Sequence, residues 1–537
     1  MGNLRSILSV SGILVLFAAC NPAPKYVKPS APSPVAYKEA APAEFKEGKG
    51  WKVGQPGDDK IRPKWWELFN DLALNALEEQ IPAGNQSLAA SEANYRAARA
   101  LVVSARSALF PTIGVAPAYS NSRISATRGA RVIGPGGVGG NSNSAAYNDF
   151  TFPFDISYTV DFWHRIRNQI AANAFSAQAS AADIATALLS EQTTLAQDYF
   201  EVRALDLQEA ILQDTLVNYR STLSLTQTLF KTGIDSEQDV TLAQTQLNTA
   251  TSQATDVGVA RSQFEHAIAT LLGRAPANFS LPVAAFVPNP PTVPVAVPST
   301  LLERRPDIAA AERQVAAANA LIGVARAAYY PNVTLTATGG FESSSFTQWF
   351  TWPSRFWSLG PTVSQTLFDG GARRGQNEQA QANYDAAVAN YRQTCLTAFQ
   401  AVEDNLASLR ILAQEIEEQQ RAIESSAHYL DLALIRYKTG VDSYLNVIIA
   451  QNSLLTNRQT QVQAQLRDMS ASVSLILALG GGWDPSQLPK MPQLLEKQRN
   501  WAPRGGPMAP APTEVAPANP PTVKPVPLNL PATPSGQ

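Results

Sequence analysis

Apolar and polar residues alternate strictly in two segments of the chain. After Pro331, apolar or small residues occupy every second position from Val333 to Phe341, and Asn or Thr lies between most of them. From Phe150 to Phe162, aromatic and aliphatic residues alternate with Thr, Asp and Ser. This period of two is typical of β-strands with one apolar and one polar face. The segment 150–162 is long enough to cross a membrane obliquely.

Weaker alternation in two further segments completes a pair of β-hairpins. These segments are 112–120, before the first strong strand, and Trp357 to about Phe368, after the second. Aromatic residues cluster beside the second hairpin, as in the girdles found at membrane interfaces: Trp349, Phe350, Trp352, Phe356 and Trp357. A soluble two-sheet sandwich shows the same alternation and is the alternative at this point.

Long helices are predicted after each hairpin. The segments Arg165 to Phe230 and about Ala372 to Tyr437 contain no proline, and each spans roughly 100 Å as an α-helix. A stripe of apolar positions on the first helix requires a partner helix: Ile184, Leu188, Leu195, Tyr199 and Val202. A second helix in each half ends near Leu272 or Leu479, and a shorter one runs from its N-cap at Asn85 to about Leu109. Helices of this length argue against a compact sandwich.

The two halves of the chain repeat each other. The turn Lys-Thr-Gly-(Ile/Val)-Asp-Ser occurs at 231–236 and again at 438–443, an offset of 207 residues (440 − 233). Upstream, Ala105-Arg106 with Phe110-Pro111 matches Ala325-Arg326 with Tyr330-Pro331 at an offset of 220 (331 − 111). A longer loop in the first half, centred on the Gly-rich run 134–141, accounts for the difference. Each half is therefore one structural repeat.

Proline-rich segments and an N-terminal apolar run mark the ends and the joint of the chain. Arg5 precedes the apolar run 7–19, which has the length of a signal-peptide core and is too short to span a bilayer. The predicted parts are a signal peptide (1–19), a Pro-rich tether (20–63), the first helix and β-hairpin repeat (64–287), a Pro-rich linker (288–298), the second repeat (299–491) and a Pro-rich disordered tail (492–537).

The signal segment ends in a candidate lipidation site. Phe17-Ala18-Ala19-Cys20 resembles the lipobox of bacterial lipoproteins, so Cys20 is predicted to carry a covalent lipid. Asn21 in place of Asp favours sorting to the outer membrane. Phe17 departs from the usual Leu, and an ordinary signal peptide with an incidental cysteine is the alternative.

Composition excludes several classes of function. The net charge is −2, so no strong positive field exists to hold nucleic acid. Two cysteines and three histidines do not supply a disulfide framework or a multi-ligand zinc site, and no metal or catalytic residue is predicted. His164, His266 and His428 lack a Ser or Cys partner motif, which argues against a hydrolase.

Four membrane strands require partners. Open strand edges in lipid leave backbone groups unpaired, at several kcal/mol each. Because known barrels begin near eight strands, two to four copies are needed, and three copies give twelve strands. The rival is a periplasmic adaptor or scaffold lipoprotein with long helical hairpins and no pore, but the repeated membrane-length strand pairs favour a channel.

Four motifs carry a family resemblance that covers nearly everything between Trp65 and Leu488. They are Trp65-Trp66-Glu67-Leu68-Phe69, Leu302-Glu303-Arg304-Arg305-Pro306-Asp307-Ile308, Leu367-Phe368-Asp369-Gly370-Gly371 with Arg373, and Ala398-Phe399-Gln400-Ala401-Val402-Glu403. The chain resembles TolC-type outer-membrane efflux factors of the NodT-like lipoprotein branch. Within the second motif, Pro306 and Asp307 favour a helix start over an anion site.

The resemblance implies an α+β membrane channel of the outer membrane of a Gram-negative bacterium. It implies a homotrimer with a twelve-stranded β-barrel and a long periplasmic α-helical barrel. It further implies a periplasmic adaptor and an inner-membrane RND-type pump as partners. Conduction of small molecules to the exterior is the implied function, with no reaction and no cofactor apart from the lipid on Cys20.

The resemblance also assigns roles to the two helix reversals. The implied adaptor-contacting tips are Thr232, Gly233, Asp235, Ser236, Thr439, Gly440, Asp442 and Ser443. The implied gate residues are Asp239, Leu445, Asn446, Ile449 and Asn452. The family commonly has acidic residues at the gate, whereas this chain has Leu445 and Asn446, which suggests an apolar and amide constriction. Turn formation and helix capping explain the Gly, Asp and Ser residues equally well.

Overall fold

The structure, a computed structural model, describes residues 21–31, 34, 37–39, 64–123, 146–291 and 304–495. The predictions for Cys20, the Gly-rich loop, most of the linker and the C-terminal tail concern residues outside these ranges. None of the helices in the described ranges combines the length and the apolar character that a membrane span requires.

Three helices of the first half each have a counterpart of the same length in the second half. They are α4 (Gln86–Ser107) and α8 (Pro306–Ala327), of 22 residues each, α5 (Arg165–Lys231) and α9 (Ala372–Lys438), of 67 residues each, and α6 (Glu237–Leu271) and α10 (Tyr444–Ala478), of 35 residues each. The long helices end within one residue of their predicted ends. The repeat seen at the turns thus extends over all six helices.

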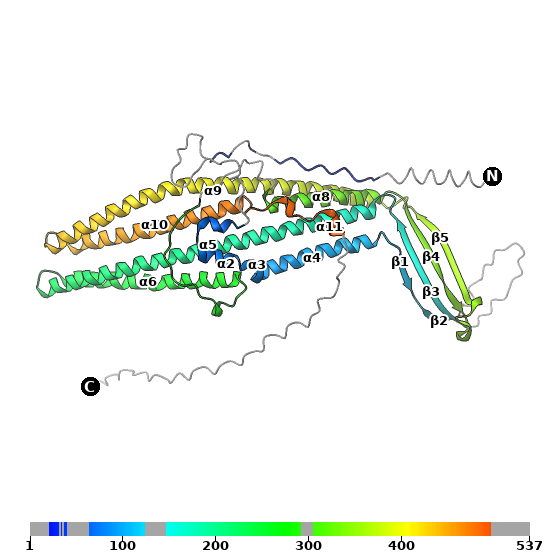
Figure 1. Cartoon of the computed structure of the whole chain (residues 1–537), viewed down its shortest axis with the longest axis horizontal. Helices are drawn as coiled ribbons and strands as arrows, with labels where there is room; N and C mark the ends of the chain where they lie inside the picture. The colour runs from blue at the N-terminus through cyan, green and yellow to red at the C-terminus, as the bar shows by residue number, and fades with distance from the viewer. Residues whose placement is uncertain are drawn as a thin grey trace, which may run out of the picture. The chain divides into compact units, whose positions relative to one another are not determined.

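The long helices form two hairpins (Figure 1). Helix α5 pairs with α6 and α9 pairs with α10, while α10 also packs against α5. The short helices α4 and α8 both pack on α5, and α8 also packs on α9. Shorter elements precede, separate or follow these helices: η1 (Trp65–Phe69), α2 (Leu72–Glu78), α3 (Ile81–Gly84), η2 (Pro276–Asn278), η3 (Phe346–Gln348), η4 (Trp352–Ser354), η5 (Pro485–Gln487) and α11 (Met491–Leu495).

One antiparallel sheet unites both predicted β-hairpins. Its strands are β1 (Thr112–Val115), β2 (Ala118–Ser122), β3 (Tyr147–Val160), β4 (Asn332–Ser343) and β5 (Arg355–Ser364). β1 and β2 both pair with β3, so they are two pieces of one strand interrupted at Ala116–Pro117. β3 pairs with β4 and β4 with β5. The prediction that the last strand reaches Phe368 is wrong, because β5 ends at Ser364 and Asp369 begins the cap of α9.

The register confirms the predicted two-faced strands. Ile156 lies opposite Ala337, and Phe152 opposite Phe341, so the apolar positions of both repeats share one face. Many of these side chains are exposed within the protomer, and Trp357 is 82% exposed. An apolar face of this extent needs lipid or another surface to cover it. At the far end of the sheet, Trp349 stacks on Phe350, and both rings contact Phe152.

Two of the sequence motifs hold helix ends in place. Pro306 is the first residue of α8, which confirms the predicted helix start, and Arg305 donates to the carbonyl of Ala478 at the end of α10 (2.8 Å). In the Phe-Asp-Gly-Gly motif, Asp369 accepts from the backbone N–H groups of Gly371 and Arg373 (3.1 and 3.2 Å). Gly370 and Gly371 have φ of 62° and 96°, which glycine adopts without strain.

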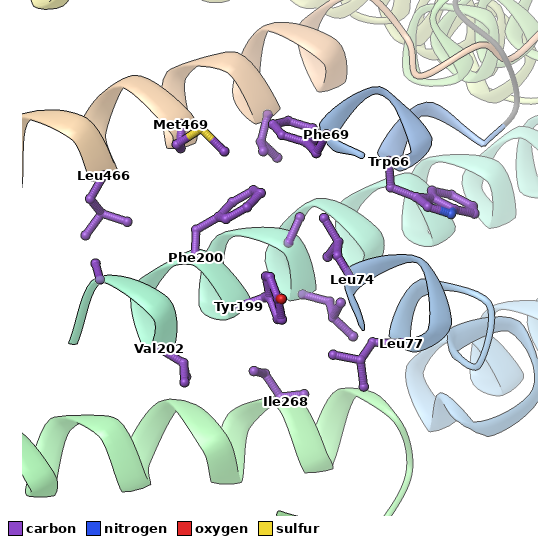
Figure 2. Close-up of a cluster of buried hydrophobic side chains, with 14 of the residues drawn as sticks. Trp66, Phe69, Leu74, Leu77, Tyr199, Phe200, Val202, Ile268, Leu466 and Met469 are labelled. Carbon is purple, nitrogen blue, oxygen red and sulfur yellow. The ribbon is translucent and has the colours of Figure 1, made fainter. Parts of the chain in front are cut away.

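The largest hydrophobic cluster of the described residues surrounds the middle of α5 and includes the C-terminal parts of α6 and α10; Figure 2 shows ten of its residues with labels. The Trp-Trp-Glu-Leu-Phe motif forms η1, whose Trp65 is fully buried and whose Phe69 ring lies 5.1 Å from that of Phe200 on α5. Leu466 and Met469 of α10 and Ile268 of α6 complete the cluster. Both hairpins and the segment before α4 therefore share one core.

Glu78, at the end of α2, is fully buried, and within the described residues neither carboxylate oxygen has a hydrogen-bond partner. Burial raises the pKa of Glu78 to about 9. Because this folded-state pKa lies above the ordinary value, the stability contributed at low pH is lost as the pH rises from about 4.5 toward 9, by about 1.4 kcal/mol per pH unit. We expect Glu78→Gln to raise the melting temperature, and to raise it more at pH 8 than at pH 6. Parallel pH profiles of melting temperature for the two proteins would contradict this.

Candidate gate at the helix reversals

Both helix reversals use the same backbone turn. Gly233 and Gly440 have φ of 77° and 72°, the left-handed conformation that favours glycine. Each glycine N–H bonds back to the preceding helix, as Gly233 does to the Phe230 carbonyl (2.9 Å), and the N–H of the next residue bonds to the carbonyl one residue earlier, as Ile234 does to Leu229 (2.9 Å). This pattern is the Schellman motif. The predicted structural role of the two glycines is confirmed.

The helices that follow the reversals are capped differently. Ser236 is the N-cap of α6: its side chain accepts from the Asp239 N–H (3.2 Å), and its hydroxyl donates to the Asp239 carboxylate (2.7 Å). In the second repeat Asn446 stands where Asp239 stands, and its amide donates to Asp442 (2.5 Å) instead. Thus Asp239 and Asn446 are both engaged at their own helix starts.

Asp442 is the one acidic residue in the sequence of the second reversal, 437–446. Its carboxylate also pairs with Arg436 (3.1 Å) and accepts from the Ser443 N–H (3.0 Å). The hydrogen bonds from Arg436 and Asn446 lower the pKa of Asp442. The carboxylate is therefore charged at neutral pH and fixes the turn 437–443.

Tyr437 joins the two reversals. Its buried hydroxyl donates to Asp235 of the first reversal and lies 3.0 Å from the hydroxyl of Thr226 on α5. Burial and the bond to Asp235 raise the pKa of Tyr437, so it stays protonated and remains a donor. The Tyr437 ring packs on Tyr444, with centroids 5.4 Å apart, in a cluster that includes residues of all four long helices.

Further polar contacts join the hairpins away from the tip. Gln451 of α10 donates to Thr222 of α5 (3.2 Å), and Gln246 of α6 donates to both Tyr219 (3.1 Å) and Asn452. Asn452, one of the predicted gate residues, is thus an acceptor in a contact between α6 and α10. These bonds continue the connection that Tyr437 begins.

The structure separates the predicted gate residues into two groups. Leu445 and Ile449 lie one turn apart on α10 and are 55% and 49% exposed, so they share an open face. Asp239, Asn446 and Asn452 instead form contacts within the protomer. Sequence reasoning missed Tyr437 as a link, although its hydroxyl is the polar difference from Phe230 at the matching repeat position. It also missed Ile234 and Val441, matching apolar residues that are 68% and 65% exposed at the two tips.

No group of His, Cys, Asp and Glu residues in the described ranges is arranged to hold a metal ion. The polar residues of the reversals form caps and links between helices. The arrangement can hold two helical hairpins together or release them.

The comparisons with known proteins agree with this architecture. The outer membrane efflux protein family model matches residues 77–274 and 297–481. The solvent efflux pump outer membrane protein SrpC of Pseudomonas putida is 30% identical over 486 residues, covering 88% of this chain and 98% of SrpC. The pyoverdine export outer membrane protein OpmQ of Pseudomonas aeruginosa is 30% identical over 477 residues, covering 89% and 97%.

Solved structures show the same fold. The outer-membrane channel OprN is 28% identical and superposes with a TM-score of 0.76, over 86% of this chain and 99% of OprN. The CmeC outer membrane channel of Campylobacter jejuni, at 23% identity, has a TM-score of 0.78 over 87% of this chain and 96% of CmeC, and supports the fold alone. The chain therefore belongs to the outer membrane efflux protein family, whose members are efflux channels and not enzymes.

Proposed function

We propose that this protein is the outer-membrane exit duct of a tripartite efflux system and conducts small molecules from an inner-membrane RND-type pump and a periplasmic adaptor to the exterior. Family membership supports this role, as do relatives named as solvent and pyoverdine exporters. We also propose that Cys20 carries the lipid, since Phe17-Ala18-Ala19-Cys20 resembles a lipobox. The residue after it, Asn21, accepts from Asn168 near the start of α5 (3.1 Å).

We further propose that the duct is a homotrimer. Helix α5 has 27 buried residues and packs on α4 and α6 of its own repeat and on α8 and α10 of the other repeat. Its counterpart α9 has ten buried residues and, among these helices, packs on α8 and α10 of its own repeat. Matching positions differ accordingly: Ala204 is 1% exposed and Ile411 is 52% exposed, and Leu189 is 7% exposed where Leu396 is 47% exposed. Repeat symmetry supplies the missing neighbours of α9, namely α4 and α6 of the next copy. Such a contact is head-to-tail and closes into a ring, and three copies bring twelve strands to one barrel.

The reversals are the proposed gate and docking tips. Leu445 and Ile449 offer the apolar constriction, and the bond from Tyr437 to Asp235 holds the two hairpins together in the closed form. Ile234 and Val441 extend the proposed adaptor surface of the tips, since each is an exposed apolar side chain beside the predicted tip residues. The main observation that supports the gate is the hydrogen bond from Tyr437 to Asp235, because it joins the two reversals directly.

Tyr437→Phe tests the proposed gate. The variant keeps the ring that packs on Tyr444 and removes only the hydroxyl. A hydrogen bond to a charged group contributes about 1.5–3 kcal/mol, so we expect about a tenfold or larger rise in ion conductance across a planar bilayer. The control is Tyr444→Phe, the same change in the neighbouring ring, whose hydroxyl has no hydrogen bond among the described residues. Equal conductance of both variants and wild type would place the closure elsewhere.

A further inference from the structure

The N-terminal segment lies against the helices as a strap. We define the strap as Asn21–Ala31 together with Tyr37–Glu39, the described residues that follow Cys20. The strap contains no helix or strand, as expected for a Pro-rich tether, but its contacts with the helices were not anticipated from the sequence. They account for a residue of the fourth sequence motif, Glu403, that the gate and the tips leave unexplained.

The first part of the strap is held by α5 and α8. Asn319 of α8 donates to the Pro24 carbonyl (3.0 Å), and Arg326 donates to the Pro22 carbonyl (3.4 Å). The Tyr26 hydroxyl donates to Glu312 of α8, which is 5% exposed, and its ring lies 6.5 Å from that of Phe175 on α5. This part of the strap therefore contacts both helices, and near its end Arg392 of α9 donates to the Ser30 carbonyl (3.2 Å).

The second part of the strap is held by α9. Both carboxylate oxygens of Glu403 accept backbone N–H groups of the strap, from Lys38 (2.7 Å) and Glu39 (2.9 Å). Arg410 then pairs with the Glu39 carboxylate (2.6 Å). Tyr37, 6% exposed, lies in a cluster with Ile308 of α8 and apolar residues of α9. The strap thus ties α9 to α8 and α5.

The equivalent place in the first repeat is occupied by the other end of the folded region. Arg99 and Arg106 of α4, which match Asn319 and Arg326 of α8, donate to the carbonyls of Gln493 (3.3 Å) and Leu495. Leu494 is fully buried in a cluster with residues of α4 and α5. This second segment contacts α4 and α5, whereas the strap extends onto α9.

After Arg410 and before Tyr437, the side-chain polar contacts of α9 with other elements are made with α10 and no longer with the strap. Among the described residues, the side-chain hydrogen bonds and ion pairs that α9 makes with other elements between Arg410 and Tyr437 go to α10: Gln419 with the Asn457 carbonyl, Gln420 with Gln461, Glu415 with Arg467, and Ser426 with Asn457. Helix α10 reaches α5 in this stretch through the exposed pair Arg458–Asp214 and through Gln451. Between Arg410 and the second reversal, α9 and α10 are therefore joined as one hairpin.

We propose that the strap sets the pivot of the α9–α10 hairpin. It fixes α9 to α8 and α5 as far as Arg410, so that opening at the tip bends α9 between Arg410 and the reversal. The inference rests on the proposed gate, because it concerns the movement that the Tyr437 bond restrains. Glu403 and Arg410 are the positioning residues, since they hold the end of the strap nearest the tip.

The test combines release of the strap with release of the tip in the full-length protein. Glu403→Ala with Arg410→Ala removes the hydrogen bonds and the ion pair that hold Lys38 and Glu39 on α9. We expect this double variant alone to keep the low conductance of wild type because Tyr437 still closes the tip. Added to Tyr437→Phe, it should raise conductance about fivefold or more above Tyr437→Phe alone, the lower end of typical couplings between sites. The matched control, Arg99→Ala with Arg106→Ala, frees the other segment and should add nothing.

Hydrogen–deuterium exchange provides a readout that does not depend on the gate. The strap variant should raise amide exchange in residues 37–39 and in α9 from 392 to 410, and the control variant should raise it in 489–495. Unchanged amide exchange in α9 of the strap variant would overturn the proposal. Faster exchange in α9 would also overturn it if the strap variant did not raise conductance further in the Tyr437→Phe protein. If Tyr437→Phe alone leaves conductance at the wild-type level, the proposed gate is wrong. Amide exchange in α9 of the strap variant then shows by itself whether the strap fixes this helix.

Discussion

Asp206→Ala should destabilise the protein by about 3–5 kcal/mol, the usual cost of removing one partner from a buried ion pair. Asp206, on α5, pairs with Arg203 (2.9 Å) and with Arg261 of α6 (2.7 Å), and the side chains of Arg203 and Asp206 are 4% and 1% exposed. The Asp206 carboxylate also accepts from the Ala284 N–H (3.2 Å). Without it, the Arg203 guanidinium loses its counter-charge in the core, and Arg261 keeps only its pair with Glu265 (2.7 Å).

The same network fixes the segment that leads to the linker. Arg203 donates to the Pro282 carbonyl and Arg261 to the Leu281 carbonyl, both at 2.7 Å. Denaturant or thermal unfolding of the detergent-purified protein measures the loss of stability. The control is Asp214→Ala on the same helix, whose pair with Arg458 is exposed and should contribute less than about 1 kcal/mol. Equal losses of stability for the two variants would show that burial of the ion-pair network does not increase the cost of removing its aspartate.

Ile411→Glu is expected to convert the trimer to monomers. In the proposed ring, Ile411 is buried between copies as Ala204 is within the protomer, and an unpaired carboxylate placed there costs several kcal/mol. The cost occurs at each of the three interfaces. Native mass spectrometry of the membrane-extracted protein reports the copy number and any acyl mass on Cys20.

A second substitution on α9 separates interface loss from a general effect of charge. Glu417→Lys also changes the charge of α9, but Glu417 and its repeat counterpart Ala210 are both exposed, so this variant should remain trimeric. A trimeric Ile411→Glu protein would mean that this face of α9 is not an interface. Monomeric wild-type protein would remove the proposal of a closed barrel.

The regular elements were predictable because their signals are periodic. Alternation located the strong strands, and the absence of proline located the 67-residue helices to within one residue. The end of β5 was misplaced because Leu367 and Phe368 continue an apolar pattern, although Asp369 and two glycines already form the cap of α9. The broken first strand was not anticipated, since Pro117 interrupts it without disturbing the alternation on either side.

Contacts between distant segments were not predictable in the same way. Tyr437 meets Asp235 across 202 residues, and Glu403 meets Lys38 across 365. Such pairings depend on how the hairpins pack and not on local period. The repeat nevertheless contains one usable signal: where matching positions differ in chemistry, as Tyr437 and Phe230 do, the difference marks a contact that only one repeat makes.

The equal lengths of α5 and α9 constrain how this chain can change. Deleting one residue from an α-helix rotates everything beyond it by about 100° and shortens it by about 1.5 Å. A deletion in α9 alone would turn Tyr437 away from Asp235 and leave the two reversals at different depths. Insertions and deletions in the long helices are therefore tolerable only in matched pairs, at the same level of both repeats, whereas the loops between the strands can differ in length.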